Sequence, residues 1–400
     1  MLESYRAVFA HRGAPAFSAT GMLARLPISM MTLGIVLLVS SVTGSYTVAG
    51  QVSAAYVIGN AVVAVPHGRL ADRLGQSLVL YVDAVLFALT TAMLVVAVTH
   101  HWSSPWQHVW AALSGATLPQ IGSLVRARWA HIVEDEAQRH TAFAVEAVGD
   151  EVVFVTGPAL VTFLSTLYAP ETGLVVALVV GTVGTLLLAL QRRTAPATNP
   201  HDRADPAVGM PWGRLVPIAV AAVALGALFG ALEVATVAAA QHGGHKAASG
   251  VLLALFSFGS MVAGLVAGAV HWSVPDHRRF QVGVGVLAVA MVVLPFLDQL
   301  VVLGALLFVI GLALAPSLIA VVSLLEASTP RTRLTEAMAV FQTGISAGIA
   351  PGAYFAGVMA DHTSGSASYW VCVVAGGLTL AAALLCRPVP SSGASSSLRP

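Results

Sequence analysis

Three acidic residues lie close together in one apolar stretch of the sequence: Glu146, Asp150 and Glu151. In a helix, Glu146 and Asp150 share one stripe because they are four residues apart, whereas Glu151 points about 100° away from Asp150. Each charge near the centre of a membrane helix costs about 2.5–3.5 kcal/mol, so three uncompensated carboxylates would cost roughly 8–10 kcal/mol. The chemistry open to such a group is ion pairing or proton exchange.

Arg25 lies at a matching depth in another apolar segment. It comes eight residues after position 17, and Asp150 comes eight residues after position 142, where the two segments begin. A pair between Arg25 and either Asp150 or Glu151 would lower the cost of burying both charges. The remaining acids, including Glu146, would then be free to exchange protons. The alternative is a permanently ionised pair that only orders the helices.

Other polar and adaptable residues inside apolar segments are candidates for a substrate cavity. Glu233 is a lone acid in the segment from 214 to 240, and an intramembrane acid is a functional candidate by default. The competing interpretation is a hydrogen bond near the membrane surface. The uncharged candidates have backbone hydrogen bonding or ordinary packing as their alternatives, and they are Asn60, Gln120, Gln342, Met30 and Phe229. No histidine pattern predicts a metal site.

The composition places all of these residues in a membrane protein. The chain of 400 residues is 57% hydrophobic and only 9% charged, whereas soluble domains carry about 25% charged residues. A net charge of +1 gives no indication of nucleic-acid binding. An enzyme or ATP-driven pump is not expected, because the sequence has no Gly-x-x-x-x-Gly-Lys loop. No cofactor is expected either, and a proton gradient is the expected energy source.

Twelve apolar segments are each long enough to cross about 30 Å of hydrocarbon. They are too long for barrel strands and do not alternate, so we expect an all-α membrane protein. The expected domains are a cytoplasmic N-terminus at 1–16, two six-helix halves at 17–191 and 214–386, a linker at 192–213 and a disordered tail at 387–400. The segments lie at 17–39, 45–67, 77–99, 105–127, 142–166, 172–191, 214–240, 247–270, 280–297, 300–325, 335–360 and 367–386.

The distribution of basic residues predicts the orientation. If both termini lie on one side of the membrane, that side contains all but two of the 19 Lys and Arg residues. The exceptions are Arg25, inside the first segment, and Lys246, on the other side. The positive-inside rule makes the basic side cytoplasmic.

The two halves also resemble each other in sequence. Arg139 and Thr141 open the fifth segment as Arg333 and Thr335 open the eleventh, and the fourth and tenth segments each carry a glycine followed by a proline. These pairs are Gly115 with Pro119 and Gly311 with Pro316. Repeats of this kind place a substrate near the membrane midplane between the halves.

The sequence between the second and third segments resembles the signature loop of the major facilitator superfamily, Gly-x-x-x-Asp-Arg-x-Gly-Arg-Arg. Here Gly68, Asp72, Arg73 and Gly75 match, and Gln76-Ser77 replace the two final basic residues. The resemblance implies a twelve-helix transporter of two pseudo-symmetric halves that works by alternating access and is expected to be a monomer. It also implies that Asp72 and Arg73 latch the halves on the cytoplasmic side.

The fifth segment resembles that of drug and proton antiporters in the same superfamily through Gly157-Pro158. The fourth segment differs from them, because Ala111 stands where antiporters carry an arginine. The resemblance implies proton-coupled efflux of a small organic molecule across a bacterial cytoplasmic membrane, with protons, substrate and lipid as partners. The alternatives are an importer of a sugar or organic acid, and a non-transporting receptor or lipid-handling protein.

Overall fold

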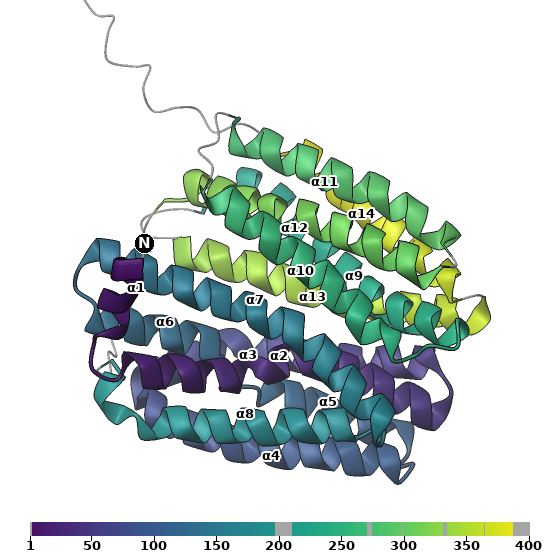
Figure 1. Cartoon of the computed structure of the whole chain (residues 1–400), viewed down its shortest axis with the longest axis horizontal. Coiled ribbons are helices and arrows are strands. Elements are labelled where there is room, and N and C mark those ends of the chain that lie inside the picture. The colour runs from purple at the N-terminus through teal and green to yellow at the C-terminus, as the bar shows by residue number, and fades with distance from the viewer. Residues whose placement is uncertain are drawn as a thin grey trace, which may run out of the picture.

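The structure is a computed structural model that describes residues 2–196, 210–269, 274–297, 299–330, 334–363 and 365–386. The described part is all-helical, and its long helices run side by side along one axis (Figure 1). The first half contains α1 (Leu2–Phe9), α2 (Ala14–Thr43), α3 (Tyr46–Leu74), α4 (Gln76–Thr99), α5 (Ser104–Ala116), α6 (Ile121–Ile132), α7 (Glu136–Leu167) and α8 (Thr172–Leu190). The second half contains α9 (Trp212–His242), α10 (Ala248–Ala269), α11 (Asp276–Val293), α12 (Leu300–Ser328), α13 (Leu334–His362) and α14 (Tyr369–Leu384).

The two halves repeat one packing pattern. In the first half, α2 packs against α7 and α8, α3 against α5, and α4 against α8. In the second half, α9 packs against α13 and α14, α10 against α12, and α11 against α14. These are the same pairs moved along the chain by six membrane segments. The halves meet where α3 packs against α13 and α7 against α10.

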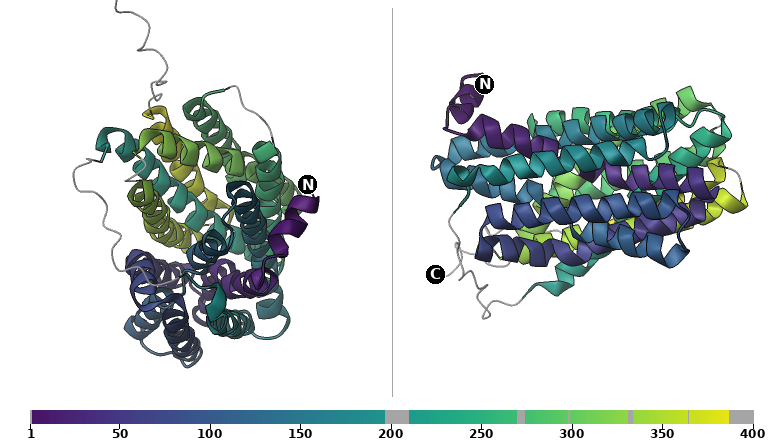
Figure 2. Two further views of the ribbon diagram at one scale, coloured as in Figure 1. Left: turned by 90° about the vertical axis from the view of Figure 1, so that its left-hand side faces the viewer. Right: turned by 90° about the horizontal axis from the view of Figure 1, so that it is seen from below.

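The two ends of the bundle are distinguished by what lies there. Helix α1 and the short 3-10 helix Arg192–Thr194 lie at one end, which we call the linker end (Figures 1 and 2). The turn between α2 and α3 and the turn between α9 and α10 lie at the opposite end, which we call the distal end. Residues can therefore be placed by their distance from either end.

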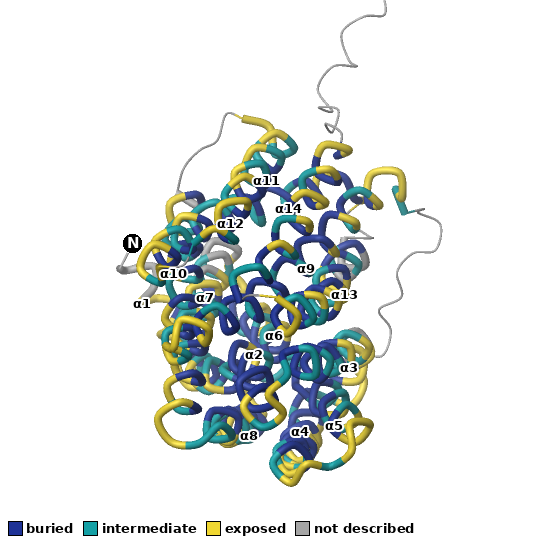
Figure 3. The backbone as a smooth tube through the Cα atoms, turned by 90° about the vertical axis from the view of Figure 1, so that its right-hand side faces the viewer, coloured by how far each residue is buried: buried dark blue, intermediate teal, exposed yellow. Residues whose placement is uncertain are grey.

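Helices α2 and α9 occupy the centre of the bundle, and α4, α8 and α11 lie at its periphery (Figure 3). Among the described residues, ten helices are long and apolar enough to span a membrane. The peripheral helices expose large apolar side chains, including Val85 at 63% and Val289 at 70%. An apolar belt of this kind is expected on a surface that faces lipid. Lipid chains surround these side chains in place of water, so their exposure does not carry the free-energy cost of contact with water.

The fourth predicted segment, 105–127, is wrong as a single helix. Helix α5 ends at Ala116, and α6 begins at Ile121 after a non-helical stretch that contains Pro119. Proline has no backbone N–H, and it disfavours the helical conformation of the residue before it, so a break at this point is expected. The matching Pro316 lies inside the continuous helix α12, so proline alone does not decide the break.

Three other expectations concern the signature sequence, the N-terminal segment and the tail with the linker. The signature sequence is not a loop, because residues 68–74 form the last two turns of α3 and only Gly75 lies in the turn to α4. The N-terminal segment 1–16 contains α1, which places Val8 in a buried position against the first half. The tail at 387–400 and most of the linker, 197–209, lie outside the described residues.

Candidate functional site

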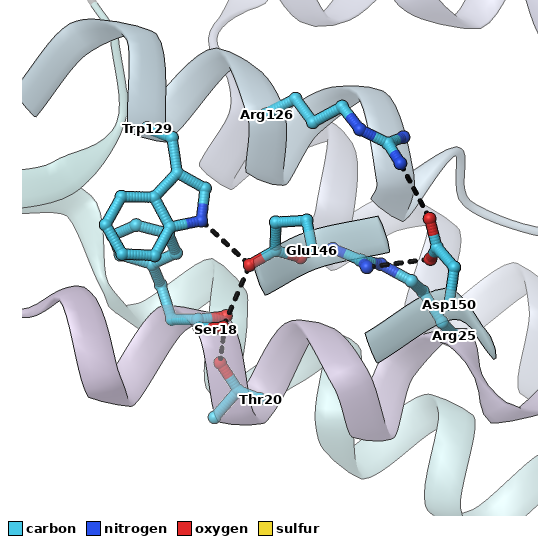
Figure 4. A network of polar contacts seen from close by, with 8 residues as sticks. Ser18, Thr20, Arg25, Arg126, Trp129, Glu146 and Asp150 are labelled. Atoms are coloured by element: carbon cyan, nitrogen blue, oxygen red, sulfur yellow. Dashed lines mark hydrogen bonds and ion pairs between the residues drawn. The ribbon is translucent and has the colours of Figure 1, made fainter. Parts of the chain in front are cut away.

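A cluster of charges joins α2, α6 and α7 (Figure 4). Arg25 Nη1 on α2 donates a hydrogen bond to Asp150 Oδ1 on α7 at 2.8 Å, and Arg25 Nη2 donates to Glu146 Oε2. Arg126 Nη2 on α6 donates to the second oxygen of Asp150 at 2.6 Å. Arg25 and Glu146 are only 4% and 2% exposed. We call these four residues the Arg25 cluster.

The Arg25 cluster is balanced in charge, and all of its carboxylate oxygens are hydrogen-bonded, whereas the Nε atom of Arg25 is buried without a described partner. The cluster contains two guanidinium groups and two carboxylates, and Glu146 Oε1 also accepts hydrogen bonds from Ser18 Oγ at 2.8 Å and Trp129 Nε1 at 2.7 Å. Each of the four carboxylate oxygens therefore has at least one donor. Burying an ion pair is tolerated when additional hydrogen bonds satisfy its atoms in this way. The cluster can act as an ionic joint that fixes three helices.

Arg25 reaches two acids because Glu146 and Asp150 lie one helical turn apart on the same stripe of α7. Of the two partners predicted for Arg25, Asp150 is paired and Glu151 is not. The expectation that Glu146 remains unpaired is wrong. Glu151 lies on another face of α7, is half-buried, and receives no hydrogen bond from any described residue.

Glu233 lies on α9 and reaches across to the other half of the molecule. Its carboxyl group forms a hydrogen bond with the Thr32 side chain on α2. Its Oε1 atom is buried and has no partner among the described residues. No described cation forms an ion pair with it, so Glu233 differs from the acids of the Arg25 cluster. An acid in this position can bind a proton or a cationic group.

Asn60 has a structural partner. Its Nδ2 donates to the carbonyl oxygen of Gly115 at 3.2 Å. That carbonyl would normally accept from the backbone N–H four residues later, but residue 119 is proline and has none. Asn60 therefore stabilises the interruption between α5 and α6, as its backbone-binding alternative predicts.

The structure gives the remaining cavity candidates different environments. Met30 is fully buried in the core, and Phe229 packs against the same core with partial exposure. Gln120 is the capping residue at the start of α6, and Gln342 is exposed on α13. These four residues do not converge on a common polar group among the described contacts.

The two glycine-containing motifs act through backbone geometry. Gly75 has φ 88°, a left-handed conformation that other residues rarely adopt, and it separates α3 from α4. A Cβ at Gly157 would lie 1.9 Å from Ser29 Oγ, so this glycine permits the close contact of α7 with α2. The next residue, Pro158, lies inside a continuous α7 and approaches α10 through its carbonyl oxygen. Gly68 and Arg73 lie in α3, and the side chain of Asp72 is outside the described part.

The hydrogen bonds that we describe between the two halves lie between the middle of the bundle and the distal end. Asp361, at the end of α13, accepts from the backbone N–H groups of Tyr46 and Thr47 at 2.7 Å each. Lys246, between α9 and α10, donates to Ser41 Oγ at 2.6 Å. Tyr46 also donates to Gln241 Oε1 at 2.7 Å. We call the contacts of Asp361 and Lys246 the distal latch.

The distal latch matches charge to helix ends. The carboxylate of Asp361 meets the N-terminus of α3, and the ammonium of Lys246 meets the last two turns of α2. Negative groups are favoured at helix N-termini and positive groups at C-termini. Both residues therefore hold the α2–α3 turn against the second half.

Comparison with known proteins identifies the family. The model of the Major Facilitator Superfamily matches residues 17–309 and 218–400, which together cover nearly the whole chain. The chain belongs to the major facilitator superfamily. No curated protein matches it significantly. The family and the apolar helices make it a multi-pass membrane protein and a transporter rather than an enzyme.

Solved structures of other transporters share the fold. The POT family transporter PepTSo is 11% identical with a TM-score of 0.72, covering 94% of this chain and 97% of that one. A mutant of the nucleoside transporter NupG is 15% identical with a TM-score of 0.72, covering 93% and 98%. The human organic anion transporter MFSD10 is 17% identical with a TM-score of 0.65, covering 94% and 99%. At these identities the likeness extends to the fold alone.

Several residues with contacts at the Arg25 cluster or the distal latch of this major facilitator protein are not predicted from the sequence. Arg126 and Trp129 lie near the end of a predicted segment, and only the packing of α6 against α7 brings them to Asp150 and Glu146. Asp361 lies just beyond a predicted segment, where an acid reads as an ordinary loop residue. Lys246 carries a usable signal, because it is the one basic residue predicted to lie in a loop on the non-cytoplasmic side.

Proposed function

We propose that this protein is a proton-coupled secondary transporter that moves a small organic molecule out of a bacterial cell. The observation that carries the proposal is the carboxyl group of Glu233. It lies where the halves meet, contacts Thr32 of the opposite half, and has one buried oxygen without a partner. A group that must couple proton binding to the movement of the halves needs this kind of position.

The Arg25 cluster supports the same proposal because its two carboxylates are poorly suited to proton exchange. A proton added to Glu146 or Asp150 would leave a buried guanidinium without its counter-charge, which is costly. A proton added to Glu233 removes a charge that has no described counter-charge. We therefore assign proton exchange to Glu233, with Glu151 as a second unpaired acid, and a structural role to Arg25, Glu146 and Asp150.

The basic residues indicate which end of the bundle lies in the cytoplasm. The linker end carries nearly all of them, so we place it, with both termini, in the cytoplasm. The distal latch then closes the external side, and release outside requires it to open. In the opposite state Asp72 and Arg73 would hold the cytoplasmic side. Outward transport is supported by the Gly157-Pro158 element, and we expect the monomer to be sufficient.

The test is proton movement in proteoliposomes with an imposed pH gradient, challenged with a panel of small organic cations, neutral drugs, sugars and organic acids. The intact protein is expected to show proton flux that depends on one class of compound. Glu233→Gln is expected to abolish that flux while exchange of labelled compound across the membrane continues. The amide keeps the size of the side chain and can still hydrogen-bond Thr32, but it cannot bind the proton.

Asp150→Asn and Glu146→Gln are the matched carboxylate controls. If they fold, they should retain compound-dependent proton flux. Loss of the flux in these variants but not in Glu233→Gln would move proton exchange to the cluster. Compound equilibration without any proton flux in the intact protein would indicate a uniporter, and uptake driven by an inward proton gradient would indicate an importer of a sugar or organic acid.

A further inference from the structure

A cavity of about 300 Å³ lies at the distal end, at the seam between the halves. Residues of α2 and α7 from the first half and of the α9–α10 turn from the second half line it together. They are Leu37, Ser41, Ser165, Thr166, Lys246 and Ala247. The described lining therefore combines one cation with three hydroxyl groups and includes no acidic residue.

The cation of this cavity is uncompensated. Among the described residues, Lys246 Nζ contacts only neutral oxygens: Leu37 O at 3.4 Å, Ser40 Oγ at 3.3 Å and Ser41 Oγ at 2.6 Å. No described carboxylate forms an ion pair with it. Partial burial lowers the pKa of Lys246 to about 8, which is the sign of an ammonium that has lost water without gaining an anion.

Two hydroxyl groups of the lining remain available as donors. Ser41 Oγ accepts from Lys246, so its own proton is free to be donated. Ser165 is 8% exposed, and its Oγ atom lies against Gly173 of α8 without a described hydrogen-bond partner. A rotation about χ1 that turns this hydroxyl toward the cavity would therefore break no described hydrogen bond. Thr166 differs, because its hydroxyl already donates to the carbonyl oxygen of Thr162. A ligand for this cavity must therefore supply negative charge and more than one acceptor oxygen.

The surroundings indicate how such a ligand would arrive. Leu167, the last residue of α7, and Tyr168, just after it, follow the lining residue Thr166 in sequence and are 58% and 71% exposed. Val251 in the first turn of α10, four residues after Ala247, is 58% exposed. An exposed tyrosine next to apolar side chains is typical of the membrane–water interface. The cavity is thus accessible to phospholipid headgroups as well as to dissolved anions.

We propose that this cavity binds a phosphate group, held by the ammonium of Lys246 and the hydroxyls of Ser41 and Ser165. Because the donors come from both halves, the group binds only when the halves are together at the distal end. It therefore stabilises the distal-closed state and adds to the distal latch. The proposal does not depend on the transported substrate or on proton coupling.

The first arm of the test uses delipidated protein in detergent and inorganic phosphate at constant ionic strength, with chloride as the reference anion. Phosphate is expected to raise the melting temperature saturably. Ser165→Ala is expected to weaken the apparent affinity about tenfold, as for the loss of one hydrogen bond to a charged group. Lys246→Gln should remove the effect. Thr99→Ala, which removes an outward hydroxyl bonded to its own helix, is the matched control.

The second arm distinguishes a lipid headgroup from free phosphate. Mass spectrometry of the protein extracted from phosphatidylglycerol nanodiscs measures retained lipid in the intact chain and in the same variants. Retained phospholipid that both Ser165→Ala and Lys246→Gln lose, with no response to free phosphate, supports the site with lipid as its source. A saturable phosphate effect lost in both supports free phosphate.

Two outcomes overturn the proposal. One is that neither phosphate nor phospholipid shows any effect in the intact protein. The other is that Ser165→Ala behaves like the intact protein, even if Lys246→Gln does not, because Lys246 would then act through the distal latch alone. Ser165 has no described partner to lose, so this variant is expected to fold.

Discussion

The Arg25 cluster and Glu233 place carboxyl groups in the same bundle under opposite conditions. In the cluster, each of the four carboxylate oxygens has a donor and the formal charges cancel. At Glu233, the carboxyl group has the Thr32 side chain as its one described polar neighbour, and its Oε1 atom is buried without a described partner. Acidic residues inside a membrane protein are therefore not equivalent: the charges around each acid decide whether it serves as a joint or as a site for a proton.

Removal of the central cation should have the largest effect on stability. Arg25→Met should lower the free energy of unfolding by about 3–5 kcal/mol, because it leaves Glu146 buried without its counter-charge. Arg25→Lys should lose less, since it keeps the charge but not the two-pronged geometry. The measurements are the melting temperature in detergent and the recovery of folded protein by gel filtration.

Arg69→Met is the control for Arg25→Met. Arg69 is an exposed arginine near the linker end, and its replacement should change stability by no more than about 0.5 kcal/mol. Equal effects of the two substitutions would contradict a structural role for the cluster.

A smaller change tests the neutral donors of the cluster. Trp129→Phe keeps the ring contact with Phe17, whose centroid lies 4.7 Å away, but removes the N–H that bonds Glu146. A hydrogen bond to a charged group contributes about 1.5–3 kcal/mol, so we expect a loss of about 2 kcal/mol in thermal stability measurements. Trp110→Phe is the matched control, because its Nε1 has no described partner. If both changes have the same effect, the indole N–H does not support Glu146.

Glu233→Gln should leave the stability of the protein almost unchanged. No described cation depends on Glu233, and the amide retains a hydrogen-bonding group for Thr32, so stability should stay within about 0.5 kcal/mol or rise slightly. Melting curves of this variant and of Asp150→Asn, recorded in the same detergent, make the comparison direct. A fall for Glu233→Gln as large as that for Asp150→Asn would indicate an undetected counter-charge.

The sequence predicts the ion pair where depth alone decides it. Arg25 and Asp150 lie equally far into their segments, so their pairing needed only the neighbouring placement of two helices. The choice between Glu146 and Glu151 depended on how α7 is rotated, and Arg126 depended on where α6 restarts after Pro119. Rotation and helix breaks are set by packing between segments, which one sequence does not determine.

The fold was predictable for a similar reason. Long apolar segments have to become helices in a membrane, because no water is available for unpaired backbone groups. The prediction is wrong at two places. Asn60 bonds a backbone carbonyl next to the break at Pro119, and residues 68–74 continue α3 as helix through the expected loop. Hydropathy contains no signal for either feature.

Lys246 extends the comparison to a cation, with the smallest expected effect. Its pKa is lowered from 10.5 to about 8 by burial, so the folded protein releases this proton before the unfolded chain does. Stability should therefore rise with pH between about 8 and 10.5, because the unfolded state binds more protons in that window. In phosphate-free detergent, the free energy of unfolding of the intact protein, followed by thermal denaturation, should rise relative to that of Lys246→Gln across this range, by about 1 kcal/mol or less after allowance for solvent screening. Added phosphate should reduce the gain, because a bound anion compensates the ammonium. A difference that stays constant or falls with pH would show that Lys246 is not an unbalanced charge.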